Sequence, residues 1–281
     1  MGWLDEVTAV IESRLACGLS LVPPERRDPG RTTSRGVGEL IQQAAVAGAE
    51  EILVGLGGSA TMDGGLGMAQ PWGWLFLDER GHAIAGSGAG LEQIAAIRPG
   101  RPPGGRIVGL VDVRNPLLGE NGARVYASQK GASPRAEEQL SRGLSRLAAL
   151  VPGGAAHAAC EGAGAAGGLG FGLMAFAGAS LRRGAEWVLE RARFGEVLRT
   201  VQLVICAEGT FDGTSVNGKL TGEVIHQATS AGVRAGVLAP RVQGVPPGVL
   251  VESGGGQWTA DDLRRNTARL VHRALRTAVD A

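Results

Sequence analysis

Apolar and polar positions along the chain follow two patterns, one typical of amphipathic helices and one typical of buried strands. The clearest example is a predicted helix over residues 37–45, which Gly48 would end, followed by a predicted strand over residues 52–56. The apolar residues that recur at helical spacing in the first segment are Val37, Leu40, Ile41, Ala44 and Ala45. A helix with one apolar face packs that face on a core, so the pattern predicts a helix–turn–strand unit.

Further elements of both kinds extend over the rest of the chain. Short apolar runs predict strands over residues 72–78, 106–113, 201–208 and 234–240. Helical periodicity predicts helices over residues 8–16, 134–151, 165–179, 184–198 and 221–232. Ser133 is the expected N-cap of the second of these helices, and Thr259 is the expected N-cap of a last one. The inner face of the last helix is expected to carry Leu263, Leu270, Val271 and Leu275. Strands that alternate with long helices predict an α/β fold with a largely parallel sheet.

Composition and charge narrow the class of protein. Of 281 residues, 44% are hydrophobic and 20% are charged, which is typical of a globular protein rather than a disordered one. The formal net charge of +1 gives no field that would favour nucleic acid or a membrane surface. No apolar run approaches the roughly 18 residues of a membrane-spanning helix, and the first residues lack the order of a signal peptide. The three cysteines form no C-x-x-C pair and suit reduced thiols, so we expect a soluble, cytoplasmic protein.

The first candidate for chemistry is a glycine-rich loop behind the predicted strand 52–56, with the sequence GLGGSATMDGG. The hydroxyls of Ser59 and Thr61, with the amides of Gly57 and Gly58, have the chemistry to bind a phosphate or a small carboxylate. Asp63 follows them and has the chemistry of a base or of a metal ligand. The loop contains no lysine, so it is not a P-loop.

A second loop, ICAEGTFDGTSVNGKLTGEV, lies between a predicted strand and a predicted helix, where open α/β sheets bind ligands. Residues 213–219 match the first seven positions of the phosphate-binding motif G-x-x-x-x-G-K-[ST], but Leu220 stands at the eighth, where the motif needs a hydroxyl. Lys219 before a helix N-terminus favours an anion site with or without that motif. Glu208 and Asp212 are spaced to present two carboxylates to a magnesium ion, and the alternative is a pair of solvated loop carboxylates.

Two further features bear on these loops. Gly162, Gly164 and Gly167 match the dinucleotide pattern G-x-G-x-x-G, but no convincing strand precedes them, so close packing of a glycine-rich helix start is the better interpretation.

Lys130 and Lys219 are the only lysines among 28 basic residues, and each stands beside glycine, where an ammonium group can approach an anion. At least one of the two is therefore a candidate anion ligand, with a solvated side chain as the alternative.

Four segments, in this order, resemble the type I glycerate kinases, bacterial enzymes that phosphorylate D-glycerate with ATP. The segments are TAVIESRLACGLSLVPP…TTSRGVGELI, GLGGSATMDGG, DVRNPLLG…SQKGA and EGAGAAGGLG…EGTFDGTSVNGK, and the resemblance extends from about residue 8 to residue 240. It implies a two-domain α/β architecture, with a Rossmann-like three-layer domain built from both chain ends and a mixed α/β domain inserted into it. Residues 1–180 would form the inserted central domain and residues 181–281 the C-terminal part of the Rossmann-like domain, with the active site between the two.

Residue chemistry and position in the family motifs together assign roles to both loops. Asp63, Asp212 and Lys219 are the predicted catalytic residues, with Lys219 on the transferring phosphates and Asp63 orienting a hydroxyl of glycerate. The predicted substrate- or phosphate-binding residues are Gly57, Gly58, Ser59, Thr61, Ser215 and Gly218. Glu208 and Asp212 would hold Mg²⁺, and ATP would be the phosphate donor.

The chain departs from the family pattern at several points. Family members begin with a strand and loop that read roughly APDSFKGS and carry a later DGGEGT, and neither is present, so the resemblance implies that the N-terminal portion of the Rossmann-like domain is missing. Met62 stands where the family has asparagine, and Thr210 stands where it has an arginine that could contact phosphate.

Two functions are alternatives to glycerate phosphorylation. One is a catalytically inactive remnant that binds a metabolite or partner without turnover, and the other is a P-loop NTPase that needs no glycerate. A sheet without its first strand would expose an unpaired edge, which predicts association into a homo-oligomer.

Overall fold

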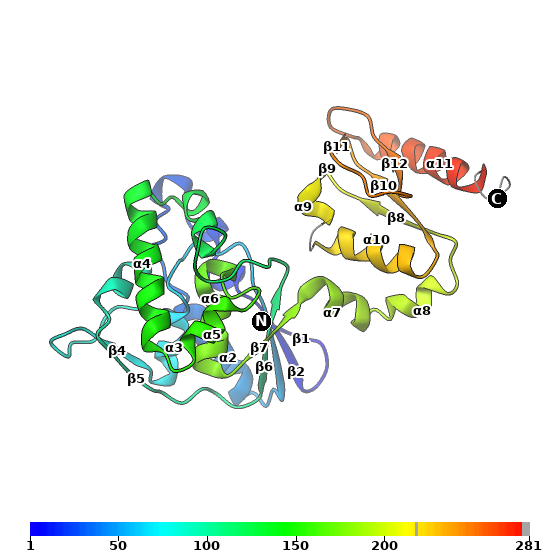
Figure 1. The fold of residues 1–281 in the computed structure, drawn as a ribbon. Coiled ribbons are helices and arrows are strands. Elements are labelled where there is room, and N and C mark those ends of the chain that lie inside the picture. Colours follow the sequence, from blue (N-terminus) through cyan, green and yellow to red (C-terminus); the bar gives the residue numbers. More distant parts are fainter. Residues whose placement is uncertain (217–218, 277–281) are drawn as a thin grey trace. The chain divides into compact units, whose positions relative to one another are not determined.

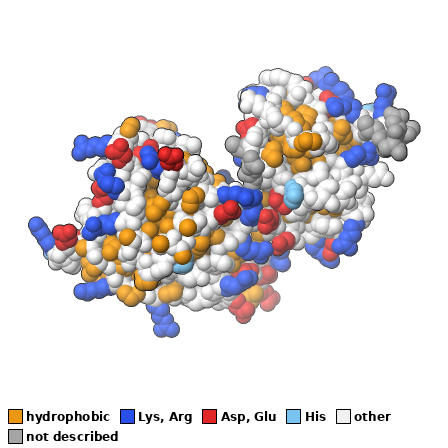
Figure 2. Space-filling view, viewed as in Figure 1, with side chains coloured by type: hydrophobic (Ala, Val, Ile, Leu, Met, Phe, Trp, Pro, Cys, Tyr) orange, Lys and Arg blue, Asp and Glu red, His pale blue; other side chains and the backbone are white. Residues whose placement is uncertain are grey.

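The computed structural model describes residues 1–216 and 219–276. The chain divides into two compact units, Met1–Arg182 and Arg183–Ala281, and each has a hydrophobic core of its own. Both units combine helices with a sheet that contains parallel strands, so the α/β class predicted from the alternation of elements is confirmed (Figure 1). Basic and acidic side chains are interspersed over the face shown in Figure 2. Within residues 1–216 and 219–276, every helix is too short or too polar to span a membrane.

The first unit is built on a five-stranded sheet with the order β1-β2-β3-β6-β7. Its strands are β1 (Gly2–Trp3), β2 (Thr8–Glu12), β3 (Glu51–Gly55), β6 (Arg106–Val111) and β7 (Ser180–Arg183). Strand β1 is antiparallel to β2, whereas β2 is parallel to β3 and β3 is parallel to β6. The loops that follow β2, β3 and β6 therefore leave the sheet at the same edge.

Helices and short 3-10 helices make up most of the rest of the first unit, and α2 and α6 contact the sheet. The α-helices are α1 (Arg14–Cys17), α2 (Arg35–Val46), α3 (Leu66–Ala69), α4 (Pro134–Leu150), α5 (Gly154–Ala159) and α6 (Ala165–Ala177). The 3-10 helices are η1 (Leu19–Leu21), η2 (Pro24–Arg26), η3 (Gln70–Trp72), η4 (Gly88–Gln93), η5 (Ala123–Tyr126) and η6 (Ser128–Lys130). The remaining strands of this unit, β4 (Leu75–Leu77) and β5 (Ala96–Arg98), pair with each other. Helix α2 buries Val37, Ile41 and Ala44, as its periodicity predicted. Ser133 caps α4 by accepting a hydrogen bond from the Ala136 amide (3.3 Å).

The second unit has a three-stranded parallel sheet with the order β12-β10-β8. Its strands are β8 (Leu203–Ala207), β10 (Arg234–Leu238) and β12 (Leu250–Glu252), and two short strands of the same unit, β9 (Thr210–Phe211) and β11 (Arg241–Val242), pair in parallel with each other. Its helices are α7 (Gly184–Arg191), α8 (Phe194–Leu198), α9 (Gly213–Val216), α10 (Leu220–Ser230) and α11 (Ala260–Arg276).

Helices α10 and α11 cover opposite faces of that sheet (Figure 1). Ala235 and Val237 of β10 belong to the same core as Ile225 of α10. A Cβ on Gly236, between them, would lie 2.6 Å from the side chain of Leu270 of α11, so a glycine is needed for the helix to approach the other face this closely. The second unit therefore has three layers, with a helix on each side of the sheet.

Two predicted helices were wrong in their extent. Residues 8–12 form the strand β2, because each of them pairs with β3 and both Ala9 and Ile11 are fully buried. The predicted helix 184–198 is divided into α7 and α8 at Arg193, whose φ of 53° is incompatible with a right-handed helix.

Helix α11 also has a different inner face from the one that the sequence predicted. Its buried residues are Asn266, Leu270 and Ala274. Leu263 and Leu275 are instead 41% and 54% exposed. The apolar stripe of this helix is thus narrower than predicted, and Leu263 is not part of it.

Candidate active site

The first candidate loop, residues 56–65, joins the carboxyl end of β3 to α3. Gly58, Gly64 and Gly65 have φ values of +60°, +61° and +80°, conformations that a residue with a side chain rarely adopts. The loop leaves the sheet at the edge where α/β proteins bind ligands. Of the predicted binding residues in it, Gly57 and Gly58 are exposed.

Ser59 and Thr61 are buried next to the side chain of Lys130, the last residue of η6. The Lys130 ammonium donates hydrogen bonds to Ser59 Oγ and to the Thr61 carbonyl oxygen, both at 2.8 Å. Lys130 is 5% exposed, and burial lowers the pKa of its ammonium to about 8. The Thr61 hydroxyl in turn donates to the carbonyl oxygen of Thr32 (3.0 Å). Both predicted hydroxyl ligands therefore take part in the hydrogen bonding of the protein itself, and their contact with a substrate stays a prediction.

Asp63 is also buried, and donors from the starts of two helices surround its carboxylate. Its Oδ2 accepts from the amide and the hydroxyl of Ser34 (2.7 and 2.8 Å) and from the Gly67 amide (3.3 Å), and its Oδ1 accepts from the Gly65 amide (3.1 Å). Burial raises the pKa of the carboxyl, and the hydrogen bonds act in the opposite direction. Asp63 thus ties the start of α2 to the start of α3. Its role in orienting glycerate stays a prediction.

The glycine-rich segment 161–170 packs directly against this loop. A Cβ at Gly167 would lie 2.0 Å from the Thr61 carbonyl oxygen and 2.9 Å from Lys130 Nζ, so a larger residue would displace both. The Gly167 carbonyl oxygen also accepts a hydrogen bond from the Gly64 amide (3.1 Å). Close packing is thus confirmed as the interpretation of the G-x-G-x-x-G pattern.

A groove with three arginines lies beside the same loop. Its volume is about 670 Å³, and its lining includes Arg26, Arg27 and Arg31 together with two acidic residues. Thr32, which also lines the groove, donates from its hydroxyl to the carbonyl oxygen of Ala60 (2.9 Å), which connects the groove to the glycine-rich loop. Guanidinium groups bind carboxylates and phosphates in a bidentate manner, so the groove has the chemistry to bind an acid. Sequence analysis missed these arginines, because the run ERRDPGR matches no motif.

In the second unit, the segment that leads from the end of β8 through β9 into α9 holds two carboxylates together. The Ser215 hydroxyl donates to Glu208 Oε2 (2.7 Å), and the Ser215 amide donates to Asp212 Oδ1 (3.3 Å). Ser215 is buried, whereas Glu208 and Asp212 are half-buried. Three predicted site residues are thus brought together at the carboxyl end of a parallel strand. We call Glu208, Asp212 and Ser215 the acidic turn.

Lys219 stands directly before helix α10, as its N-cap residue, and is exposed. A helix N-terminus carries a partial positive charge, to which the ammonium group adds. Gly218, the neighbouring predicted phosphate ligand, lies outside the described residues.

The acidic turn fits a magnesium ion that is shared with a phosphate. Among residues 1–216 and 219–276, no group of three or more His, Cys, Asp or Glu side chains is placed to hold a metal ion. Glu208 and Asp212 offer two carboxylates, and Mg²⁺ usually combines one or two carboxylates with waters and substrate phosphates. The donor set therefore suits an ion that arrives with a nucleotide.

The predicted site residues fall into two sets, one in each unit. The first lies between Gly57 and Asp63, and the second between Glu208 and Lys219. That both sets line one active site stays a prediction. The sequence indicates Lys130 by its rarity and by its position beside glycine, but it gives no signal for Ser34, which is 29 residues from the carboxylate that it binds.

Comparisons with known proteins identify relatives of the chain. The model of the glycerate kinase family matches residues 1–253. A glycerate 2-kinase of Escherichia coli (strain K12) is 45% identical over 226 residues, which cover 77% of this chain and 58% of the relative. A glycerate kinase of Bacillus subtilis (strain 168) is 43% identical over 222 residues, which cover 76% of this chain and 58% of the relative. The chain thus spans less than two thirds of the length of these curated relatives.

Solved structures give a concordant result. The crystal structure assigned to a glycerate kinase 2 from Salmonella typhimurium LT2 has a TM-score of 0.75 and 37% sequence identity to this chain. The match covers 97% of this chain and 75% of that structure. The likeness therefore extends over nearly the whole chain, both units included.

Proposed function

Because the chain belongs to the glycerate kinase family, we propose that it transfers a phosphoryl group from ATP to D-glycerate, which gives phosphoglycerate. The acidic turn is the observation that carries this proposal. Phosphoryl transfer depends on positioning and on neutralising the charge of the phosphate oxygens, with little covalent chemistry for the protein to perform. Two carboxylates and a lysine before a helix N-terminus are groups that meet these needs.

The phosphate side of the reaction is proposed to involve the second unit. Glu208 and Asp212 would hold Mg²⁺, with the Ser215 hydroxyl keeping Glu208 in place. When bound, the ion would neutralise charge on the transferred group and polarise it for attack. The exposed ammonium of Lys219 would contact the transferring phosphate.

The acid substrate is proposed to involve the first unit. Glycerate carries a carboxylate, which the arginine-lined groove and the exposed amides of Gly57 and Gly58 have the chemistry to bind. For Asp63 we propose a positioning role, since its carboxylate bonds to Ser34 and to two glycine amides. The buried Lys130 would hold the same loop through Ser59 and Thr61.

A coupled assay of ADP release tests the proposal directly. The chain is incubated with Mg²⁺ and ATP, with and without D-glycerate, alongside the variant Lys219→Ala and the control Arg80→Ala, which changes an exposed arginine in the turn after β4. We expect glycerate-dependent ADP release from the chain and from the control, and a much slower release from Lys219→Ala.

Two results would contradict the proposal. An absence of glycerate-dependent ADP release would favour the inactive remnant, and equal ADP release without glycerate would favour a P-loop NTPase. A cytoplasmic location and association with a second copy of the chain stay predictions that this assay does not address.

A further inference from the structure

A second pocket lies in the second unit, at the carboxyl edge of its parallel sheet. Its volume is about 620 Å³, and its walls come from the turn after β8, the turn after β10 and the segment 256–260 that leads into α11. Strands β8 and β10 are parallel neighbours, so the pocket lies where open α/β sheets bind ligands. Its volume is in the range of small-molecule sites.

Large apolar side chains form much of the lining, namely Leu238, Pro240, Trp258 and Leu263. Leu263 is the leucine that the helical pattern placed on the inner face of α11, yet it is 41% exposed on the pocket wall. A solvent-exposed leucine and a tryptophan on one concave wall leave apolar surface for a ligand to cover. Such a wall suits a flat, weakly polar ring.

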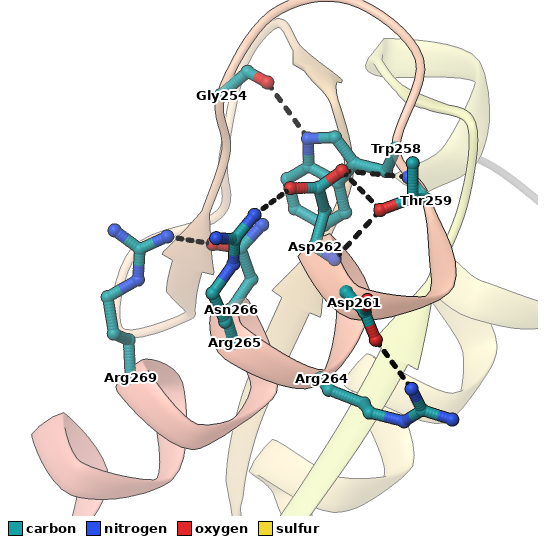
Figure 3. Close-up of polar contacts among 9 residues, drawn as sticks. All are labelled: Gly254, Trp258, Thr259, Asp261, Asp262, Arg264, Arg265, Asn266 and Arg269. Carbon is teal, nitrogen blue, oxygen red and sulfur yellow. Dashed lines mark hydrogen bonds and ion pairs between the residues drawn. The ribbon is translucent and has the colours of Figure 1, made fainter.

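The wall that carries Trp258 is held in place before any ligand arrives. The indole Nε1 donates a hydrogen bond to the Gly254 carbonyl oxygen (2.8 Å), as Figure 3 shows. The next residue, Thr259, donates from its hydroxyl and its amide to Asp262 Oδ2 (2.7 and 2.9 Å), and the Asp262 amide donates back to the Thr259 hydroxyl (3.2 Å). This capping arrangement fixes the first turn of α11 and with it Leu263.

The same pocket shares a residue with the acidic turn. Glu208, one of the two carboxylates proposed to hold Mg²⁺, also lines the pocket. A ligand with an apolar ring and an anionic, metal-binding tail could therefore place its ring on the apolar wall and its tail at Glu208. Glycerate, which is small and polar throughout, gains little from an indole and two leucines.

We propose that this pocket binds the nucleoside of the phosphate donor, with the purine ring against Trp258 and Leu263. The inference rests on the proposed function, because it assumes that ATP is the donor. It adds to that function a site for the base, in which Trp258 and Leu263 lie outside the motifs that mark the family in the sequence.

Nucleotide binding to the whole chain tests the inference by calorimetry. The probes are ADP with Mg²⁺, adenosine, and tripolyphosphate with Mg²⁺. We expect Trp258→Ala to weaken the binding of ADP and adenosine about tenfold, because stacking on an aromatic ring is lost. Leu263→Ala should weaken both about threefold, since part of the apolar wall is removed. Tripolyphosphate, which lacks the base, should bind equally well to the original chain and to both variants.

Leu275→Ala is the matched control. Leu275 lies on the same helix, is 54% exposed and does not line the pocket, so its loss should leave the binding of all three probes unchanged. Circular dichroism and thermal unfolding establish that each variant is folded. Unchanged binding of ADP and adenosine by folded Trp258→Ala and Leu263→Ala would overturn the inference, as would equal weakening of tripolyphosphate. Glycerate-dependent ADP release by the original chain, measured separately, would then leave the proposed function standing.

Discussion

The loop after β3 and the turn after β8 both follow the carboxyl ends of parallel strands, but their charged residues have opposite environments. In the first, Asp63 is 0% exposed and bonds to Ser34, and Lys130 of η6, which donates hydrogen bonds to the loop, is 5% exposed. In the second, Lys219 is exposed, and Glu208 and Asp212 are half-buried. Both units thus use acids, hydroxyls, glycines and a lysine. In the first unit the charges are buried and hydrogen-bonded, which we call a closed site. In the second unit the charges are in contact with water, which we call an open site.

Desolvation explains why the two sets should respond differently to mutation. A buried charge is tolerated only when hydrogen bonds replace the water that it has lost, so removal of one partner leaves the others unsatisfied. A half-buried or exposed charge keeps contact with water, and its loss costs little stability. Changes in the first unit should therefore appear mainly as lost stability, and changes in the second mainly as lost activity.

The largest effect is expected for Asp63→Ala. Its removal leaves the amide and hydroxyl of Ser34 and the amides of Gly65 and Gly67 without their acceptor, so the free energy of unfolding should fall by about 3–5 kcal/mol. Urea unfolding followed by circular dichroism measures this loss. Asp212→Ala is the matched change in the second unit and should cost less than about 1 kcal/mol. Similar losses in the two variants would contradict the contrast between a closed and an open site.

The two lysines of the chain provide the next test, because the same substitution can be made at both. Lys219→Ala should slow glycerate-dependent ADP release about a hundredfold, since a phosphate contact is lost, and should lower the free energy of unfolding by less than about 1 kcal/mol. Lys130→Ala should lower the free energy of unfolding by about 2–3 kcal/mol, because Ser59 Oγ and the Thr61 carbonyl oxygen lose a shared donor. The reverse pattern, with stability lost at Lys219 and retained at Lys130, would show that the roles are exchanged.

The sequence predicts those parts of the fold that depend on neighbouring residues. Helix α2 follows from its apolar spacing, and the start of α4 follows from Ser133 and Pro134. The run TAVIE is too short to distinguish the two periods, so the sequence predicts a helix where strand β2 forms. The strand conformation of these residues is determined by pairing with β3, which lies about 40 residues further along the chain. Local sequence patterns therefore do not predict structure that depends on residues far apart in the chain.

The candidate site shows the same limit. The loop sequence indicates that Ser59, Thr61 and Asp63 matter, but it cannot show that they are buried. Their burial depends on Lys130, 71 residues from Ser59, and on Ser34, 29 residues from Asp63. The acidic turn was easier to predict, because its carboxylates and Ser215 lie within one short segment. A lysine beside glycine in a chain of arginines was the one sequence signal for Lys130.

A smaller effect is expected within the acidic turn itself. Ser215→Ala removes the hydroxyl that donates to Glu208, so this carboxylate should be less well placed to hold Mg²⁺. The Mg²⁺ concentration for half-maximal activity should rise about tenfold, while the rate at saturating Mg²⁺ stays within about a factor of two of the original. Ser145→Ala, which removes an exposed hydroxyl from α4, serves as the control. An unchanged Mg²⁺ requirement would remove Ser215 from the proposed ion site.

The smallest effect concerns pH and the buried Lys130. Burial lowers the pKa of its ammonium from the ordinary 10.5 to about 8, whereas the unfolded chain keeps the ordinary value. Between these pH values the unfolded state binds a proton that the native state has released, so the contribution of Lys130 to stability rises with pH. Cys17 acts in the opposite sense above pH 9, because burial raises the pKa of its thiol from 9.0 to about 12, and Asp63 is the remaining charged neighbour. The clearest window is therefore pH 8 to 9.

Over that window, the difference in unfolding free energy between the original chain and Lys130→Met should grow by about 1 kcal/mol. Urea unfolding at pH 8.0, 8.5 and 9.0 measures this difference, and Leu275→Met, which removes no titratable group from an exposed position, should show no such growth. A constant difference for Lys130→Met would mean that the Lys130 ammonium is as well hydrated in the native state as in the unfolded chain. The interpretation of the first unit as a closed site, with its charges removed from water, would then be wrong for Lys130.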